Sequence, residues 1–124
     1  MHRLLRGRHA DVAGRQAEDL AAAALQAEGW QIVARRARTE AGEIDIIATR
    51  GALLAFVEVK ARPSFTEAAF ALGRRQRARL MAAAEAWLAV NAGYGTAGIR
   101  FDVILVAADG ALRCITDAFR LGDA

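Results

Sequence analysis

Two apolar runs with charged side chains set into them constrain the fold of this chain more than any other feature. The first run is Glu43–Thr49, the second is Leu53–Lys60, and only Arg50-Gly51-Ala52 separates them. Such short spacing predicts an antiparallel hairpin. A two-residue turn at Gly51-Ala52 then places Asp45 opposite Glu58.

In this register, four charged groups of the hairpin share one face. Side chains alternate along a strand, so Glu43 and Asp45 take one face and the two neighbouring isoleucines take the other. Glu58 and Lys60 separate from the neighbouring valines in the same way, with Lys60 opposite Glu43. Any loop of even length preserves the shared face, whereas an odd-length loop or a bulge scatters the four groups.

Opposed carboxylates at Asp45 and Glu58 are the chemically informative part of this face. Their Cβ atoms would lie about 4.5 to 5.5 Å apart, and two such anions repel each other unless a cation lies between them. Mg²⁺ or Mn²⁺ takes hard oxygen ligands, so two carboxylates and a substrate phosphate form a sufficient site. Lys60, the one lysine beside 16 arginines, would orient water or stabilise charge on the phosphate. The pattern is typical of a hydrolytic phosphodiesterase site.

The same four residues also have a purely structural interpretation. Charged groups on one strand face form cross-strand ion pairs in solvent, each contributing a few tenths of a kcal/mol. The hairpin pattern alone leaves both interpretations open.

The rest of the chain predicts a single α/β domain over residues 11–124. The expected order is α-β-β-β-α-β-β, with one core in a chain of 124 residues. The first ten residues carry three arginines and two histidines without a clear period, which favours a basic arm, either mobile or folded. The other expected elements are a helix at Asp11–Glu28, a strand at Trp30–Arg36, a helix at Arg74–Val90, and strands at Phe101–Val106 and Leu112–Thr116.

The charge balance favours a polyanionic partner. The formal net charge is +3, and nearly all of the positive charge is arginine, whose guanidinium matches phosphate oxygens. Nothing aromatic interleaves with the arginines, so duplex or junction DNA is a better match than single strands. Between the two nucleic acids, we expect DNA more than RNA. Two groups are candidates for binding nucleic acid, although each is also compatible with a solubilising surface. They are Arg35, Arg36 and Arg38 before the hairpin, and Arg74, Arg75 and Arg79 on the second helix.

Targeting signals are not apparent in the sequence. No run approaches the roughly 18 apolar residues of a membrane span, and the first residues do not resemble a signal peptide. Cys114 is the single cysteine, so no internal disulfide forms. We therefore expect a cytoplasmic protein without a membrane partner.

Four short motifs closely resemble the YraN family of small bacterial proteins. The resemblance covers about Gly14 to Phe119, and it implies a restriction-endonuclease-like core with a mixed central sheet flanked by helices, similar to archaeal Holliday-junction resolvases. The motifs are Ala17-Glu18, Gly42-Glu43-Ile44-Asp45, Val57-Glu58-Val59-Lys60 and Arg100-Phe101-Asp102-Val103.

The resemblance also implies individual roles. Asp45 and Glu58 would be metal ligands, with Lys60 as the catalytic lysine. Glu18 matches a helix glutamate that approaches the metal directly or through water, although an exposed helix glutamate is the alternative. Gln76 stands where relatives often carry a lysine, and its amide can orient water or phosphate. Glu43 would support the ligands or pair with Lys60.

These observations lead to one main hypothesis and two alternatives. The main hypothesis is an endonuclease dependent on Mg²⁺ or Mn²⁺ that hydrolyses phosphodiester bonds of DNA, including branched or junction DNA. A homodimer would be required for symmetric cutting, whereas a monomer nicks single sites. The alternatives are a non-catalytic nucleic-acid-binding module that retains the nuclease fold, and an interaction scaffold without a nucleic-acid role.

Overall fold

A computed structural model describes residues 2–65 and 72–119, and side chains within 14–65 and 72–117. The described elements follow the predicted α-β-β-β-α-β-β order and form an α/β fold around an open sheet. They are α1 (His2–Ala27), β1 (Gln31–Thr39), β2 (Gly42–Arg50), β3 (Leu53–Arg62), α3 (Arg74–Val90), β4 (Gly98–Ala107) and β5 (Leu112–Phe119). Among these residues, neither helix combines the length and apolar character needed to span a bilayer.

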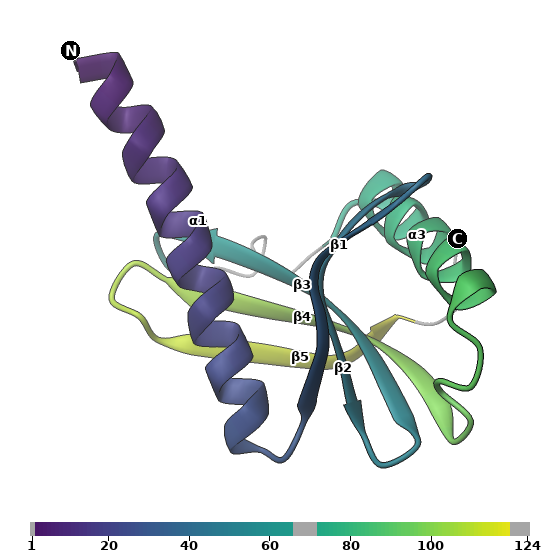
Figure 1. Cartoon of the computed structure of the whole chain (residues 1–124). Helices are drawn as coiled ribbons and strands as arrows, with labels where there is room; N and C mark the ends of the chain where they lie inside the picture. Colours follow the sequence, from purple (N-terminus) through teal and green to yellow (C-terminus); the bar gives the residue numbers. More distant parts are fainter. Residues whose placement is uncertain (1, 66–71, 120–124) are drawn as a thin grey trace.

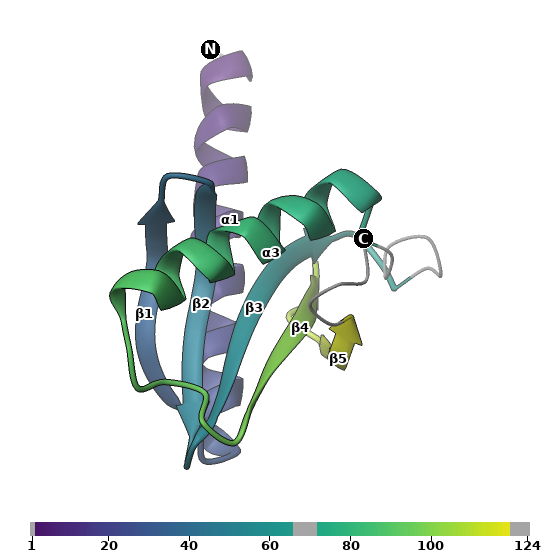
Figure 2. The ribbon, with the colours of Figure 1, turned by 90° about the vertical axis from the view of Figure 1, so that its right-hand side faces the viewer.

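The sheet is mixed, with the strand order β1-β2-β3-β4-β5. Strands β3 and β4 pair in parallel, while the other neighbours pair antiparallel. Parallel neighbours need a long crossover connection, which here contains α3. Figures 1 and 2 show α1 on one face of the sheet and α3 on the other, with β3 at the centre.

Each helix covers its own hydrophobic core. On the α3 face, the ring of Phe56 packs edge-on against Trp87 at 5.9 Å and stacks with Phe101 at 5.7 Å between ring centroids. On the α1 face, buried alanines such as Ala17 and Ala21 pack against the sheet. Small side chains let the α1 backbone approach the sheet closely, which brings α1 near the middle of the hairpin.

The β2–β3 hairpin has the register predicted from its two-residue turn. The described pairs run from Arg50 opposite Leu53 to Ile46 opposite Val57, and the pairing ends there. Beyond this point β3 curves away from β2 (Figure 2). The two strands therefore separate just before Asp45 and Glu58.

The predicted alternation of β2 is wrong at one position. Ile44 packs in the core under α3, whereas Ile46 packs in the core under α1, so these two side chains do not share a face. The pairing of β1 with β2 skips the intervening position: Arg35 pairs with Ile46 and Ala37 with Ile44. Arg36 has a φ of 50°, and this left-handed residue accompanies the local change in the direction of the strands.

Several boundaries also differ from those predicted. Helix α1 begins at His2 rather than at Asp11, so the backbone of the predicted basic arm is helical from residue 2. Strands β1 and β5 each run three residues further than expected, to Thr39 and Phe119. Propensity and periodicity fix the type of an element better than its ends.

Candidate functional site

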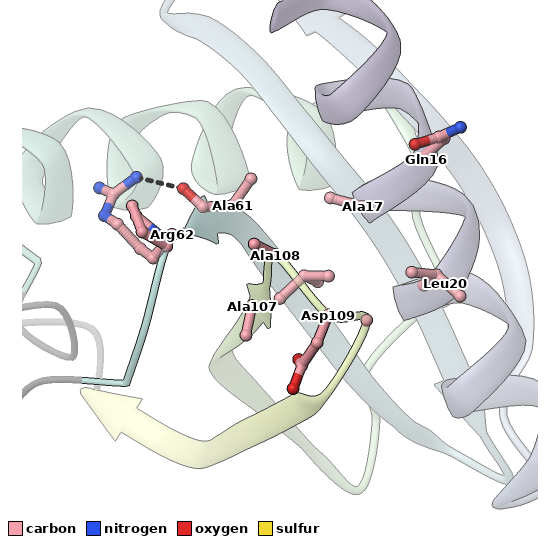
Figure 3. A pocket seen from close by; sticks show the side chains of 11 residues that line it. Gln16, Ala17, Leu20, Ala61, Arg62, Ala107, Ala108 and Asp109 are labelled. Carbon is pink, nitrogen blue, oxygen red and sulfur yellow. Dashed lines mark hydrogen bonds between the residues drawn. The ribbon is translucent and has the colours of Figure 1, made fainter.

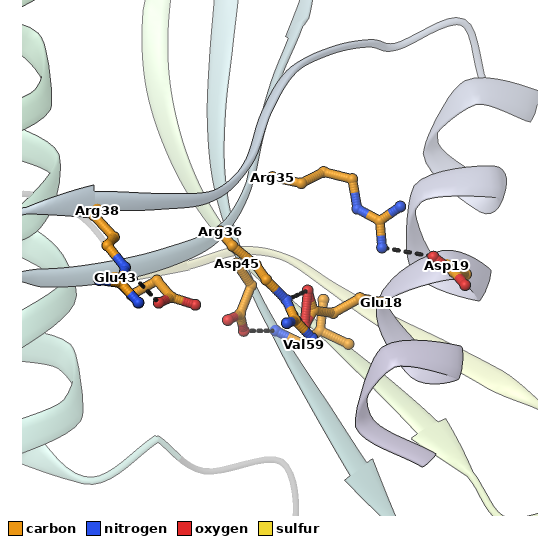
Figure 4. A network of polar contacts seen from close by, with 8 residues as sticks. All are labelled: Glu18, Asp19, Arg35, Arg36, Arg38, Glu43, Asp45 and Val59. Atoms are coloured by element: carbon orange, nitrogen blue, oxygen red, sulfur yellow. Dashed lines mark hydrogen bonds and ion pairs between the residues drawn. The ribbon is translucent and has the colours of Figure 1, made fainter. Parts of the chain in front are cut away.

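Asp45 lies where the hairpin strands part, and its carboxylate replaces a missing backbone contact. The Val59 N–H donates a hydrogen bond of 2.8 Å to Asp45 Oδ2 (Figure 4). Burial raises the pKa of Asp45, and the Val59 hydrogen bond opposes that shift. Further negative charge on Glu18 and Glu43 adds to the rise. Asp45 is therefore both a structural acceptor and a member of an acidic cluster.

Glu58 is the more deeply buried carboxylate of the pair. Only 9% of the residue is exposed, and its Oε2 atom is buried without a hydrogen-bond partner among the described residues. Burial first, and then the negative charge of Asp45, raise the pKa of Glu58 to about 7. The cations of Arg79 and Lys60 oppose this rise. The structure thus places Asp45 and Lys60 close enough to Glu58 to act on it electrostatically, and Glu58 keeps an unpartnered acceptor atom among the described residues.

Glu18 reaches the same cluster from α1, and Arg36 binds it there. Arg36 Nε donates to both carboxylate oxygens of Glu18, at 2.9 and 3.1 Å (Figure 4). Glu18 is 9% exposed, and its charge contributes to the raised pKa values of Asp45 and Glu58. Glu18 therefore lies within electrostatic range of Asp45 and Glu58, but its immediate partner is an arginine.

Arg79 extends from α3 into the site. Its Nη2 atom lies 3.6 Å from Glu58 Oε1, and its Nη1 donates a hydrogen bond of 3.2 Å to the Glu43 carbonyl. A Cβ at Gly42 would lie 3.1 Å from Arg79 Nη1, and the φ of +141° at Gly42 also disfavours other residues. Gly42 therefore leaves room for an arginine that links α3, β2 and Glu58.

The other predicted residues lie around this centre. Glu43 forms a 3.9 Å ion pair with Arg38 instead of pairing with Lys60, and Arg35 pairs with Asp19 at 2.7 Å (Figure 4). On the first turn of α3, three side chains are exposed and form no hydrogen bond or ion pair within the described part of the chain. They are Arg74, Arg75 and Gln76.

The cluster has oxygen donors for a hard cation but is only partly assembled. Among the described residues, no group of three or more Asp, Glu, His or Cys side chains is arranged to hold a metal ion. Asp45 and the unpartnered oxygen of Glu58 offer two carboxylates at the separation of the strands. Mg²⁺ and Mn²⁺ commonly use one or two carboxylates and complete their coordination with water and substrate phosphate.

A pocket of about 520 Å³ lies elsewhere, between α1 and the ends of β3 and β4 (Figure 3). Its walls are largely apolar and include Ala17 and Val106, and its polar side chains are Gln16, Arg62 and Asp109. Asp45, Glu58 and Lys60 do not line it. The titratable groups of the hairpin opening therefore lie outside this pocket.

A comparison with protein families shows to which family the chain is related. The model described as Uncharacterised protein family UPF0102 matches residues 17–106. The chain belongs to the UPF0102 family. This confirms the predicted resemblance to the YraN family, and the matched span contains every residue of the hairpin site and Glu18. The implied relationship to nucleases stays a prediction.

Relatives within UPF0102 match most of the chain. The UPF0102 protein of Granulibacter bethesdensis is 59% identical over 121 residues, which cover 98% of this chain and 77% of that protein. The UPF0102 protein of Rhodopseudomonas palustris strain HaA2 is 54% identical over 94 residues, covering 76% and 73% of the two chains. The UPF0102 protein of Azorhizobium caulinodans is 49% identical over 108 residues, covering 87% and 82%.

Sequence reasoning missed the inward roles of two arginines. Arg36 and Arg79 were predicted to contact nucleic acid, but each is held by a carboxylate of the site in this structure. The glycine before Glu43 was a signal for the position of Arg79, because a residue without Cβ permits a close approach. Arg36 has no equivalent local signal, since its partner Glu18 lies 18 residues away.

Proposed function

We propose that this UPF0102 protein is a divalent-metal-dependent endonuclease that hydrolyses phosphodiester bonds of DNA, including branched or junction DNA. The observation that carries the proposal is the buried Glu58 carboxylate, whose Oε2 lacks a partner among the described residues although it lies beside Asp45 and Lys60. Maintaining two neighbouring carboxylates with so little compensation is costly for the fold. A cation-binding role explains that cost.

The donor set of the hairpin fits Mg²⁺ or Mn²⁺. Asp45 and Glu58 would hold the ion, and Glu18 is the third candidate ligand once it leaves Arg36. When bound, the cation supplies positive charge that neutralises the phosphate and promotes ionisation of water. Asp45 meanwhile keeps β3 in place through the Val59 N–H.

The protein's own cations complete the proposed mechanism. Lys60 lies two positions beyond Glu58 and acts electrostatically on it, so its ammonium is placed to stabilise negative charge on a phosphate at the same site. Arg74 and Arg75 are exposed on the first turn of α3, where the helix dipole also favours anions. We propose that they contact the DNA backbone away from the cleaved bond.

A combined binding and cleavage experiment tests this proposal. Mn²⁺ and Mg²⁺ are titrated by calorimetry into the wild type and into Asp45→Asn, Glu58→Gln and Lys60→Met. Cleavage of a DNA duplex and of a four-way junction is followed in parallel. The two carboxylate variants should lose metal binding and cleavage, while Lys60→Met should keep metal binding and lose at least about 100-fold in cleavage rate.

The control variant is Glu85→Gln, which removes an exposed carboxylate from α3 outside the site. It should bind metal and cleave like the wild type. Equal cleavage by the wild type and all three site variants would refute the nuclease proposal. Sedimentation of the DNA complex then tests whether two copies act together, as symmetric cutting requires.

One observation favours a second candidate function, a non-catalytic nucleic-acid-binding module. Glu18 is engaged by Arg36, and the described residues contain no assembled group of three metal ligands. This function predicts DNA binding that weakens steeply with salt, without metal binding at the hairpin. Duplex binding that is identical in the wild type and Asp45→Asn, without Mn²⁺ binding or cleavage, would support it.

A further inference from the structure

The positively charged side chain of Arg36 lies among the carboxylates of the acidic cluster. Its Nε binds both oxygens of Glu18, and its positive charge also acts on Glu43 and Asp45. Figure 4 shows its side chain extending from β1 between Asp45 and Glu18. The guanidinium thus supplies part of the positive charge that neutralises the acidic cluster.

The backbone at this position is strained in a way that supports a specific role. Arg36 has a φ of 50°, a conformation that is uncommon for residues other than glycine, asparagine and aspartate. In the described pairing of β1 with β2, the position of Arg36 and Asp45 is skipped. Strained residues of this kind persist where the surroundings hold them, and they are often found at functional sites.

The neighbouring ion pair provides an internal comparison. Arg35 also links β1 to α1, through Asp19 at 2.7 Å, but its side chain and that of Asp19 are 39% and 67% exposed. The side chain of Arg36 is 46% exposed, but Glu18 has only 12% of its side chain exposed, so the Arg36 contact is shielded from water on the carboxylate side. Shielded hydrogen bonds between charged groups are stronger than exposed ones. The Arg36 contact therefore competes effectively for Glu18.

We infer that Arg36 is a positioning residue that holds Glu18 out of the metal site and competes with the divalent cation for its carboxylate. The inference rests on the proposed function, because it concerns a ligand of the same site. Metal binding at full coordination then requires Glu18 to exchange the guanidinium for the ion. This exchange lowers the metal affinity of the free protein.

Mn²⁺ titration by calorimetry tests this competition without relying on activity. Arg36→Asn removes the guanidinium and tolerates a positive φ, and it should bind Mn²⁺ about tenfold more tightly than the wild type, as expected for loss of one competing charged hydrogen bond. The matched control Arg35→Asn removes the same charge one residue away and should change the affinity less than about threefold. Arg36→Gly repeats the test if Arg36→Asn unfolds.

A double-mutant cycle separates positioning from simple charge repulsion. In a Glu18→Gln background, Arg36→Asn should leave Mn²⁺ affinity within about threefold, because the contact that it releases is already absent. An unchanged affinity in Arg36→Asn, or an equal gain with and without Glu18, overturns the inference while leaving the metal site intact. If neither the wild type nor Arg36→Asn binds Mn²⁺, the proposed function itself fails.

Discussion

The two ends of the β2–β3 hairpin use different acceptors for the backbone N–H groups of β3. At the turn end, Ile46 to Arg50 pair regularly with β3, and most of the side chains are buried and apolar. At the open end, the pairing stops and the Asp45 carboxylate accepts the Val59 N–H. A side-chain carboxylate has a free oxygen and a charge that a carbonyl does not have. The open end therefore has a charged oxygen acceptor where the turn end has a regular backbone hydrogen bond.

The difference shows how a small sheet tolerates a cluster of carboxylates that lowers the stability of the fold. The apolar turn end and the two cores supply stability, whereas the open end holds carboxylates whose pKa values are raised by burial. We expect substitutions at the two ends to have opposite effects on the free energy of unfolding.

The largest effect should come from the regular part of β3. Phe56→Ala removes a fully buried ring that contacts Trp87 and Phe101, and it should lower the free energy of unfolding by about 3 to 5 kcal/mol. Denaturant titration measures the change. Leu112→Ala, at a position 37% exposed, serves as a control and should cost under about 1 kcal/mol. Similar costs for both variants would contradict this account of the core.

Glu58→Gln should stabilise the metal-free protein at high pH. The folded pKa of Glu58 is about 7 and its ordinary value is 4.5, so the native state retains a proton that the unfolded chain loses between these values. Stability from this group is present below pH 4.5 and falls as the pH rises to 7. The gain in Glu58→Gln should grow over this interval to at most about 3 kcal/mol.

Thermal or denaturant unfolding of both proteins from pH 4 to 8 measures this divergence. Glu85→Gln, on the exposed side of α3, should follow the wild-type pH profile. Parallel profiles for Glu58→Gln and the wild type would show that the Glu58 carboxylate is not destabilised by burial.

The smallest predicted effect isolates the acceptor function of Asp45. Asp45→Ala and Asp45→Asn both remove the charge, but only asparagine retains an oxygen for the Val59 N–H. Asp45→Asn should be more stable than Asp45→Ala by about 1 to 2 kcal/mol. Hydrogen exchange of the Val59 amide should be faster in the alanine variant. Equal exchange rates would mean that the carboxylate does not replace a backbone acceptor.

Local patterns were sufficient to predict the hairpin and the proximity of Asp45 to Glu58. The two-residue turn at Gly51-Ala52 sets the register, and that register brings Asp45 near Glu58. Local patterns did not predict that Ile44 and Ile46 would face different cores. This change coincides with the left-handed backbone of Arg36 in the neighbouring strand, and strand alternation alone does not reveal it.

Contacts between distant elements were harder to infer. The helical pattern around Glu18 is compatible with an exposed side chain as well as with a site residue, and only the packing of α1 on the sheet places Glu18 against Arg36. Arg79 shares a helix face with Arg75, which suggested a pair for binding phosphate. The approach of α3 to Gly42 instead directs Arg79 to Glu58.

The parallel pairing of β3 with β4 has a consequence for the order of assembly. Every carboxylate of the site precedes α3 in the chain, while β4 follows it and pairs with β3 from Leu53 to Arg62. A growing chain therefore produces its repelling charges before the strand that supports Glu58 from the other side. Because long-range pairings need the intervening chain, β3 cannot acquire this parallel neighbour beside Glu58 until β4 has been synthesised.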